Sequence, residues 1–154
     1  MTDILYRTTG EQDLDIVAPL WEKLVLHHRD RSVHFKKKFD GLAWETRRRE
    51  LLKKAAGGTM RVDLAYDGKK LVGYCVSTVI SAKRGEIDSV YIEDGYRDRG
   101  IGTRFMEAAM VWLHEQGAEK WEIGVAAGNE EVLPFYARFG FHPYVIVLRH
   151  AGDS

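Results

Sequence analysis

The segment with the clearest potential for chemistry is a stretch rich in arginine and glycine, YIEDGYRDRGIGT, at positions 91–103. It follows a strand-like pattern at 86–92 and opens a helix-like pattern at 100–116, which puts Gly100 and Gly102 at a helix start. The first N–H groups of a helix lack partners within the helix, and they carry a partial positive charge. Glycines let a phosphate approach the backbone, and arginines add charge-assisted hydrogen bonds. The segment therefore predicts a phosphate site, with a pyrophosphate as its natural guest.

Such a helix start is not specific for a phosphate on its own, because the same glycines can shape a turn while the arginines lie in solvent. Two better-defined phosphate motifs are absent from the sequence. It contains no G-x-x-x-x-G-K-[ST] loop and no G-x-G-x-x-G fingerprint. The predicted site is therefore neither a P-loop nor a dinucleotide-binding turn.

The elements that must position this segment follow from hydrophobic periodicity. Apolar runs and alternations predict strands at 5–9, 60–66, 71–80, 86–92, 121–126 and 141–149. Apolar positions three and four residues apart predict helices at 12–28, 42–56, 100–116 and 130–139. The basic stretch at 29–40 has neither period, so it predicts a mobile loop or a short helix.

Two local signals turn these elements into a fold. Asp67-Gly68 lies between two strands and predicts a β-hairpin. Strand 86–92, helix 100–116 and strand 121–126 form a β-α-β unit, whose two strands run parallel. We therefore predict one α/β (mixed α+β) domain over residues 1–154, with a mixed, mostly antiparallel sheet and helices on both faces.

Composition excludes several classes of protein. The chain has 23 basic and 23 acidic residues, so no overall attraction to nucleic acid or to an anionic membrane is expected. No apolar run approaches the roughly 20 residues of a membrane span, and the N-terminal stretch does not look like a signal peptide. The single cysteine, Cys75, cannot form an internal disulfide. We therefore expect a cytoplasmic protein with no nucleic-acid or membrane partner, and the histidine spacing predicts no metal site.

Two stretches resemble a known family. Arg97-Asp98-Arg99-Gly100-Ile101-Gly102 resembles the R/Q-x-x-G-x-G/A loop of the GNAT acetyltransferases. NEEVLPFYARFGF, at 129–141, resembles the N-x-x-A-x-x-F-Y-x-x-x-G-F motif of the same family. The motifs occur in the family's order, and the clear resemblance covers about residues 60–148. Two positions depart from it: Asp98 puts a carboxylate beside the phosphate loop and must point away, and Val132 replaces a small alanine.

The resemblance implies acetyl-coenzyme A as co-substrate, with its pyrophosphate on the loop amides. In this family the two parallel strands splay apart, the pantetheine arm pairs with strand 86–92, and the acetyl end enters the gap. An N–H near Val90 would then polarise the thioester carbonyl, as an oxyanion donor does. The implied cofactor-binding residues are Val90, Tyr91, Ile92, Arg97, Asp98, Arg99, Gly100, Ile101, Gly102, Thr103 and Asn129.

The resemblance also implies catalytic residues. Tyr136 matches the family tyrosine that protonates the departing thiolate, and a phenol pKa of about 10 is close enough to a thiol's roughly 8.5 for this. The alternative is that Tyr136 is a core aromatic. Glu86 lies where some members have a glutamate base, and Asp88 lies on the same strand face. The alternatives are that both carboxylates are solvated charges, or that no side chain acts as base.

Together these observations predict an N-acetyltransferase in which a primary amine attacks acetyl-coenzyme A directly in a ternary complex. A non-catalytic acyl-coenzyme A-binding module is the alternative. The acceptor is a small-molecule amine or a protein amine, and in this fold its pocket comes from the first two helices, their connecting loop and the last strands. His27 and His28 face that region and Trp44 could line it, although histidines at a helix end are often structural. A homodimer is also compatible with the fold.

Overall fold

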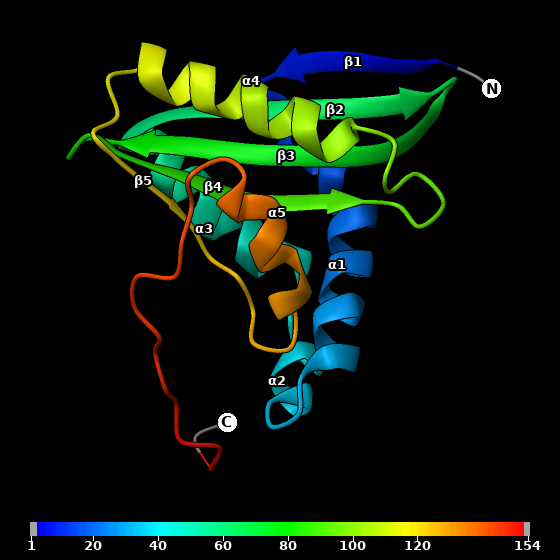
Figure 1. The fold of residues 1–154 in the computed structure, drawn as a ribbon, viewed down its shortest axis with the longest axis vertical. Coiled ribbons are helices and arrows are strands. Elements are labelled where there is room, and N and C mark those ends of the chain that lie inside the picture. Colours follow the sequence, from blue (N-terminus) through cyan, green and yellow to red (C-terminus); the bar gives the residue numbers. More distant parts are fainter. Residues whose placement is uncertain (1–2, 153–154) are drawn as a thin grey trace.

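A five-stranded sheet in the order β1-β2-β3-β4-β5 forms the centre of the molecule (Figure 1). The computed structural model describes residues 3–152. The strands are β1 (Ile4–Thr9), β2 (Gly58–Asp67), β3 (Lys70–Ile80), β4 (Arg84–Ile92) and β5 (Lys120–Ile123). Strands β1 to β4 are paired antiparallel in sequence order, and β5 runs parallel to β4. The predicted mixed sheet with one parallel pair is confirmed.

Helices cover both faces of this sheet, as predicted. They are α1 (Ala18–Arg31), α2 (Lys36–Asp40), α3 (Trp44–Ala56), α4 (Ile101–Glu115) and α5 (Leu133–Ala137), with 3₁₀ segments η1 (Glu11–Val17) and η2 (Glu130–Val132). One apolar core joins α1 and α3 to the sheet through Val17, Trp21, Leu51, Val62 and Tyr74, among others. A second core joins α4 and α5 to the opposite face through Val72, Ile87, Phe105, Leu113 and Tyr136, among others. Because the central strand β3 packs on both cores, nearly all of it is buried.

The hairpin predicted at Asp67-Gly68 joins β2 to β3. Asp67 pairs with Lys70, so two residues form the turn, and Gly68 has a φ of 62°. Glycine adopts this left-handed conformation without steric cost, which explains its place in a tight hairpin turn. The meander from β2 to β4 therefore follows directly from local sequence.

Two predicted elements have different bounds in the structure. The expected helix at 12–28 divides into η1 and α1, because Asp13 has non-helical dihedral angles and Pro19 lies in the first turn of α1. Proline lacks a backbone N–H and fits best at a helix start. The basic stretch at 29–40 contains the short helix α2, which was one of its two predicted forms. Within residues 3–152, no helix is both long and apolar enough to cross a bilayer.

The C-terminal part of the sheet departs from prediction. The strand expected at 121–126 pairs with β4 only from Lys120 to Ile123. The strand expected at 141–149 is wrong, because these residues form neither strand nor helix. Apolar, β-branched sequence favours a strand only where its backbone groups find a neighbouring strand to pair with. In the described chain, residues 142–150 reach no such neighbour, and they extend away from the sheet (Figure 1).

Candidate active site

The site begins where β4 and β5 part. Their parallel pairing ends at Ile87 and Ile123, yet β4 continues to Ile92. On its other side β4 stays paired with β3, and the N–H of Glu93 donates to the Val72 carbonyl over 2.8 Å. Because peptide groups in a strand alternate in direction, those of residues 88, 90 and 92 face the gap. The structure therefore has an open strand edge inside the sheet.

Two arginines mark the ends of this open edge. Arg47 of α3 donates from its Nη2 to the Asp88 carbonyl over 3.0 Å, and Arg97 donates from its Nε to the Ile92 carbonyl over 3.0 Å. Val90 lies midway between these two carbonyls along β4. Its peptide group therefore faces the gap between two capped positions. This is the residue for which the sequence predicted a thioester contact.

The predicted phosphate loop lies at the far end of the same strand. Gly100 is the N-cap of α4, its φ is 83°, and no side chain in the described chain caps this helix start. A Cβ added at Gly102 would approach the Phe135 ring to 3.2 Å and the Ile92 side chain to 3.3 Å. The small residue at 102 thus lets α4 pack close to β4 and α5. Asp98 has a φ of 61°, a conformation that aspartate tolerates better than most residues.

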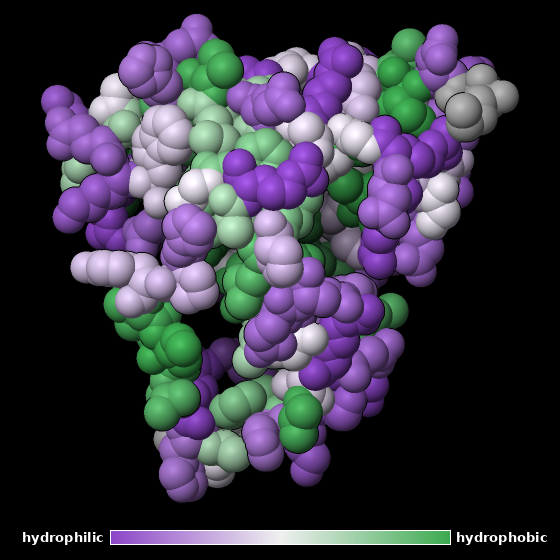
Figure 2. Space-filling view, viewed as in Figure 1, coloured by the Kyte–Doolittle hydropathy of each residue, from purple (hydrophilic) through white to green (hydrophobic). Residues whose placement is uncertain are grey.

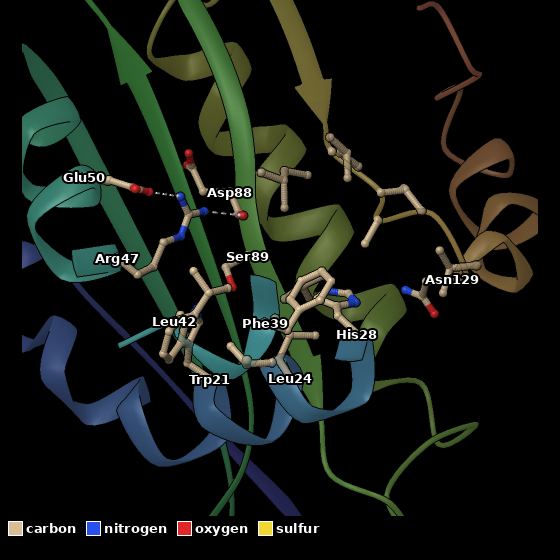
Figure 3. Close-up of a pocket in the computed structure, with 18 of the residues that line it drawn as sticks. Trp21, Leu24, His28, Phe39, Leu42, Arg47, Glu50, Asp88, Ser89 and Asn129 are labelled. Atoms are coloured by element: carbon tan, nitrogen blue, oxygen red, sulfur yellow. Dashed lines mark hydrogen bonds and ion pairs between the residues drawn. The ribbon is translucent and has the colours of Figure 1, made fainter. Parts of the chain in front are cut away.

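A cavity of about 360 Å³ opens beside β4, and Val90 is one of the residues that line it. Helices α1, α2 and α3 supply one wall, and β4, the segment 123–126 and α5 supply the other (Figure 3). Its apolar surface comes from Trp21, Leu24, Val25, Phe39, Leu42, Val125 and Val132. Its polar groups come from His28, Lys38, Thr46, Arg47, Glu50, Asp88, Ser89, Asn129 and Tyr136. The cavity is therefore amphipathic and lies between the N-terminal helices and the open edge of β4.

Tyr136 is one of the residues that the structure brings to this cavity. Its side chain comes from α5 and is only 9% exposed, and its ring lies 5.5 Å from that of Phe135. Burial, and to a smaller degree the nearby Cys75, raises the pKa of Tyr136 to about 12. The phenol therefore holds its proton at neutral pH. Its hydroxyl is available as a proton donor in the cavity, but the raised pKa makes it a weaker acid than a free tyrosine, since a general acid works best with a pKa near the operating pH.

The two candidate bases lie in different surroundings. Asp88 lines the cavity, whereas Glu86 is not part of its lining in the described chain. Lys54 of α3 contacts both, donating to Glu86 over 2.9 Å and also to Asp88. Thr78 donates to the second oxygen of Asp88 over 2.7 Å. Both carboxylates therefore have charged partners, and Asp88, whose side chain is fully buried, accepts hydrogen bonds on both oxygens.

Burial raises the pKa of Asp88, while the hydrogen bonds from Lys54 and Thr78 act in the opposite direction. A buried ion pair stabilises a fold only when its remaining hydrogen bonds are satisfied. The cluster of Lys54, Glu86 and Asp88 meets that condition and ties α3 to β4. Because α3 also carries Arg47, we interpret Asp88 first as a residue that positions α3, and with it Arg47, against β4.

Comparison with known proteins decides the family. Residues 21–141 match the acetyltransferase (GNAT) family. The chain belongs to the GNAT acetyltransferases. The mixed sheet with its parallel β4–β5 pair is the sheet of a GNAT acetyltransferase, and the fold prediction is confirmed.

Individual proteins of known name are similar to this GNAT chain in sequence or in fold. A phosphinothricin N-acetyltransferase of Streptomyces coelicolor is 28% identical over 97% of this chain and 84% of its own length. An uncharacterized N-acetyltransferase of Methanocaldococcus jannaschii is 28% identical over 47% of this chain, and the match spans only 32% of that protein. Among solved structures, a GCN5-related N-acetyltransferase from Ralstonia eutropha superposes with a TM-score of 0.74 at 21% identity, covering 96% of this chain and 98% of that one. An aminoglycoside acetyltransferase from a soil metagenome gives 0.61 at 17% identity, covering 96% and 95%.

The two histidines of α1 have different surroundings in this GNAT structure. His28 lines the cavity and lies beside Phe39, with a ring separation of 6.0 Å. Burial, followed by the nearby His27 and Arg31, lowers the pKa of His28 to about 4, so its imidazole is neutral at pH 7. Its Nδ1 is buried without a hydrogen-bond partner in the described chain. His27 instead lies 3.3 Å from the Asn129 side chain and outside the cavity lining.

Some cavity residues were not found from the sequence of this GNAT chain. Arg47 lies in a run of three arginines on α3, and helical periodicity does not separate it from Arg48 and Arg49. Ser89 and Phe39 carried no motif. Trp44, which the sequence suggested for the acceptor side, packs behind Trp21 with a ring separation of 5.4 Å and donates to Asp15. Only the contact of α3 with the middle of β4, at the Asp88 carbonyl, distinguishes Arg47 from its neighbours.

Proposed function

We propose that this protein transfers an acetyl group from acetyl-coenzyme A to a primary amine by direct attack within a ternary complex. One observation carries the proposal. The open edge of β4 lines an amphipathic cavity at Val90, and the same strand continues to Ile92 and the phosphate-type loop at the start of α4. An acyl donor held at the loop and an amine held in the cavity can therefore meet at the same peptide group. Holding both reactants in line is a large part of what such a reaction needs.

The residues of the first half fit coenzyme A. Uncapped N–H groups at the start of α4 suit a pyrophosphate, and the left-handed Gly100 leaves their approach open. Tyr91 and Ile92 continue the strand edge toward that loop, where Asp98, Arg99, Ile101 and Thr103 complete the predicted contact set. Asn129 lines the cavity opposite β4. When bound, acetyl-coenzyme A supplies an activated thioester, and these residues hold and orient it.

Chain residues supply the remaining steps. The Val90 N–H donates to the acyl oxygen, where negative charge develops as the amine nitrogen bonds to the carbon. Tyr136 gives its proton to the sulfur as the carbon–sulfur bond breaks, and the amine nitrogen releases one proton. Because burial raises the pKa of Tyr136 to about 12, the proton is present throughout the neutral range. Solvent then returns a proton to the phenolate.

Removal of the amine proton is the least defined step. Glu86 stays a predicted base, acting through water, although its hydrogen bond with Lys54 lowers its availability. Asp88 accepts from Lys54 and Thr78, which occupies both of its oxygens. We therefore favour an acceptor amine that enters the cavity unprotonated. After it attacks the carbonyl carbon, its nitrogen loses one proton to water. Activity should then rise with pH as the free acceptor amine is deprotonated.

The cavity favours an acceptor that carries a carboxylate as well as an amine. The Arg47 side chain is 27% exposed, and its partner Glu50 is 58% exposed and 3.1 Å away, so an incoming carboxylate can replace Glu50 (Figure 3). Guanidinium groups bind carboxylates through paired hydrogen bonds. Trp21, Phe39 and Leu42 would contact the apolar part of such a molecule. One sequence relative is named for phosphinothricin and one structural neighbour for aminoglycosides, so small molecules of these two kinds are the acceptors to try first.

Two measurements test this function. Calorimetry with coenzyme A and acetyl-coenzyme A reports cofactor binding, and a thiol-release assay over amino acids, aminoglycosides, polyamines and peptide N-termini reports transfer. Binding together with amine-dependent thiol release supports the proposal. Tight binding with no release from any amine would favour the non-catalytic acyl-coenzyme A module instead. Absence of binding by folded protein would refute both.

A further inference from the structure

An irregularity in β4 turns two successive side chains toward the cavity. In the pairing of β4 with β3, Ile87 and Ser89 have partner residues, but Asp88 between them has none. Neighbouring side chains of a regular strand point to opposite faces, whereas an extra residue in one strand breaks that alternation. Asp88 and Ser89 accordingly both line the cavity. The cavity therefore receives one more polar side chain than a regular strand would supply.

The hydroxyl of Ser89 is held in place from behind the cavity wall. Ser89 is 8% exposed, and its Oγ lies 2.8 Å from the hydroxyl of Tyr74, a fully buried residue of β3. Burial raises the pKa of Tyr74, while its hydrogen bond with Ser89 and the charge of Arg47 act in the opposite direction. Tyr74 therefore keeps its proton, and the guanidinium of Arg47 lies near this pair of hydroxyls.

This hydroxyl keeps an acceptor position for a ligand. A serine hydroxyl has one donor and two acceptor positions. If Tyr74 donates to Ser89, one acceptor position of Ser89 remains, and if Ser89 donates to Tyr74, two remain. Ser89 can therefore accept an N–H from a ligand in either arrangement. The neighbouring Asp88 offers less, because Lys54 and Thr78 already donate to its two oxygens.

The wall around Ser89 is largely apolar. Figure 3 shows Ser89 on β4 between Arg47 and Phe39, with Trp21 and Leu42 also lining the cavity. Hydrophilic residues cover much of the outer surface of the body (Figure 2), where one more hydroxyl would be unremarkable. A polar group in an apolar wall is more informative, because it needs a hydrogen-bond partner there. Ser89 therefore marks a fixed point for a polar group of the acceptor.

Two groups that the proposed reaction uses flank Ser89. The carbonyl of Asp88, on the N-terminal side, accepts from Arg47 over 3.0 Å, and the Val90 N–H lies on the C-terminal side. Asp88 and Val90 are two residues apart on a strand, which corresponds to about 7 Å. An α-amino acid spans such a distance once a hydrogen bond or a close contact is added at each end. A longer separation between amine and carboxylate does not fit an extended molecule here.

We propose that the Ser89 hydroxyl accepts a hydrogen bond from the acceptor amine, and that Ser89 and Arg47 together select α-amino acids. Tyr74 is the positioning residue, because its hydroxyl fixes that of Ser89. The inference rests on the proposed function and adds the place of the reacting amine. With one N–H bonded to Ser89, the lone pair of the amine can face a thioester carbon held beside Val90. An amine at the far end of an acceptor bound to Arg47 would lie away from Ser89.

Two isomeric acceptors test this selection. Norleucine and ε-aminocaproate contain the same atoms, but only norleucine has its amine next to its carboxylate. For the unaltered protein we expect kcat/KM, calculated from the free-amine concentration, to be at least tenfold higher for norleucine. In Ser89→Ala this preference should shrink about fivefold, because only the norleucine amine loses a hydrogen bond. Ser89→Thr keeps the hydroxyl and should keep the preference.

Two further variants separate this hydrogen bond from general support of the strand. Tyr74→Phe leaves the Ser89 hydroxyl unheld and should reduce the norleucine preference about threefold, while coenzyme A affinity by calorimetry stays the same. Ser77→Ala is the matched control, because Ser77 is a buried serine of the neighbouring β3 that does not line the cavity. The preference for norleucine should be unchanged in this control.

The same assays give the outcomes that overturn the inference. Equal kcat/KM for the two isomers in the unaltered protein would do so, and so would an unchanged preference in Ser89→Ala or equal losses for both isomers. Thiol release with other amines but with neither isomer would remove the inference and leave the proposed function standing. Absence of thiol release with every amine would remove both.

Discussion

The two sides of the cleft are built from different materials. On the proposed cofactor side the groups offered to a ligand belong to the backbone, at the open edge of β4 and at the start of α4. On the acceptor side they are side chains from α1, α2 and α3, including His28, Phe39 and Arg47 (Figure 3). Backbone groups need particular glycines and a particular strand order, whereas side-chain walls can change residue by residue. The cofactor half should therefore tolerate few amino-acid substitutions, and the acceptor half should set the selectivity for the amine.

The largest expected effect is at the junction of the two sides. Tyr136→Phe removes the proton donor without changing the ring, and we expect kcat to fall about 100-fold, within the usual range for a general acid. Cofactor affinity by calorimetry should change little, and the loss should be similar for every amine. Unchanged turnover across several amines would remove Tyr136 from the mechanism.

A smaller and selective effect is expected on the acceptor side. Arg47→Gln should lower kcat/KM for an amino acid about 30-fold, because a hydrogen bond to a charged group contributes about 1.5–3 kcal/mol. The corresponding amino-acid amide, which lacks the carboxylate, should lose much less. Arg49→Gln is a control, since Arg49 lies on the exposed side of α3. Equal losses for acid and amide would show that Arg47 only supports β4.

A non-selective effect of about tenfold is expected on the cofactor side. Gly100→Ala strains a residue with a φ of 83°, by about 1–2 kcal/mol, and disturbs the helix start. Coenzyme A affinity should fall, while the ranking of acceptor amines should not change. Gly117→Ala is the matched control, because Gly117 has a φ of 75° but follows the C-terminal end of α4, at the opposite end of that helix from the loop. Altered acceptor ranking in Gly100→Ala would break the division between the two sides.

The last effect concerns stability rather than activity, and it should appear as a dependence of unfolding on pH. His28 has a folded-state pKa of about 4, below its usual 6.5, so the unfolded chain binds the proton more readily. The free energy of unfolding should therefore fall as pH drops from 6.5 toward 4, and this loss should be reduced in His28→Gln. Denaturant unfolding at several pH values measures it, with His142→Gln as an exposed control. An identical pH profile for His28→Gln would contradict the burial argument.

Most of the cofactor half could be predicted from the sequence, because its determinants are local. Alternation and the Asp67-Gly68 turn predicted the meander, and Gly100 and Gly102 marked the start of α4. The register shift near Val76 and the early end of β5 could not be predicted, since they depend on how strands meet. Residues 141–149 show the limit most clearly, because an apolar run indicates strand sequence without indicating which strand it pairs with.

The acceptor half was less predictable for a related reason. Lys54 meets Asp88 across 34 positions of sequence, and Arg47 meets the Asp88 carbonyl across 41. No local pattern links such positions, so nothing in the sequence indicates that α3 contacts the middle of β4. His28 differs from His27 only in the direction of its ring, which packing against Phe39 sets. The proposed acceptor site therefore depends on tertiary contacts, while the proposed cofactor site depends largely on local motifs.

The retained pairing of β4 with β3 has a consequence for how the Val90 peptide behaves in time. Ser89 and Tyr91 are held opposite Val76 and Tyr74, so the peptide between them cannot reorient unless the sheet opens. Hydrogen–deuterium exchange in the unliganded protein should then alternate along β4, slow at 89 and 91 and fast at 90. A donor that is stationary yet open to solvent is ready before the substrate arrives, and little of the activation barrier is left for rearranging it.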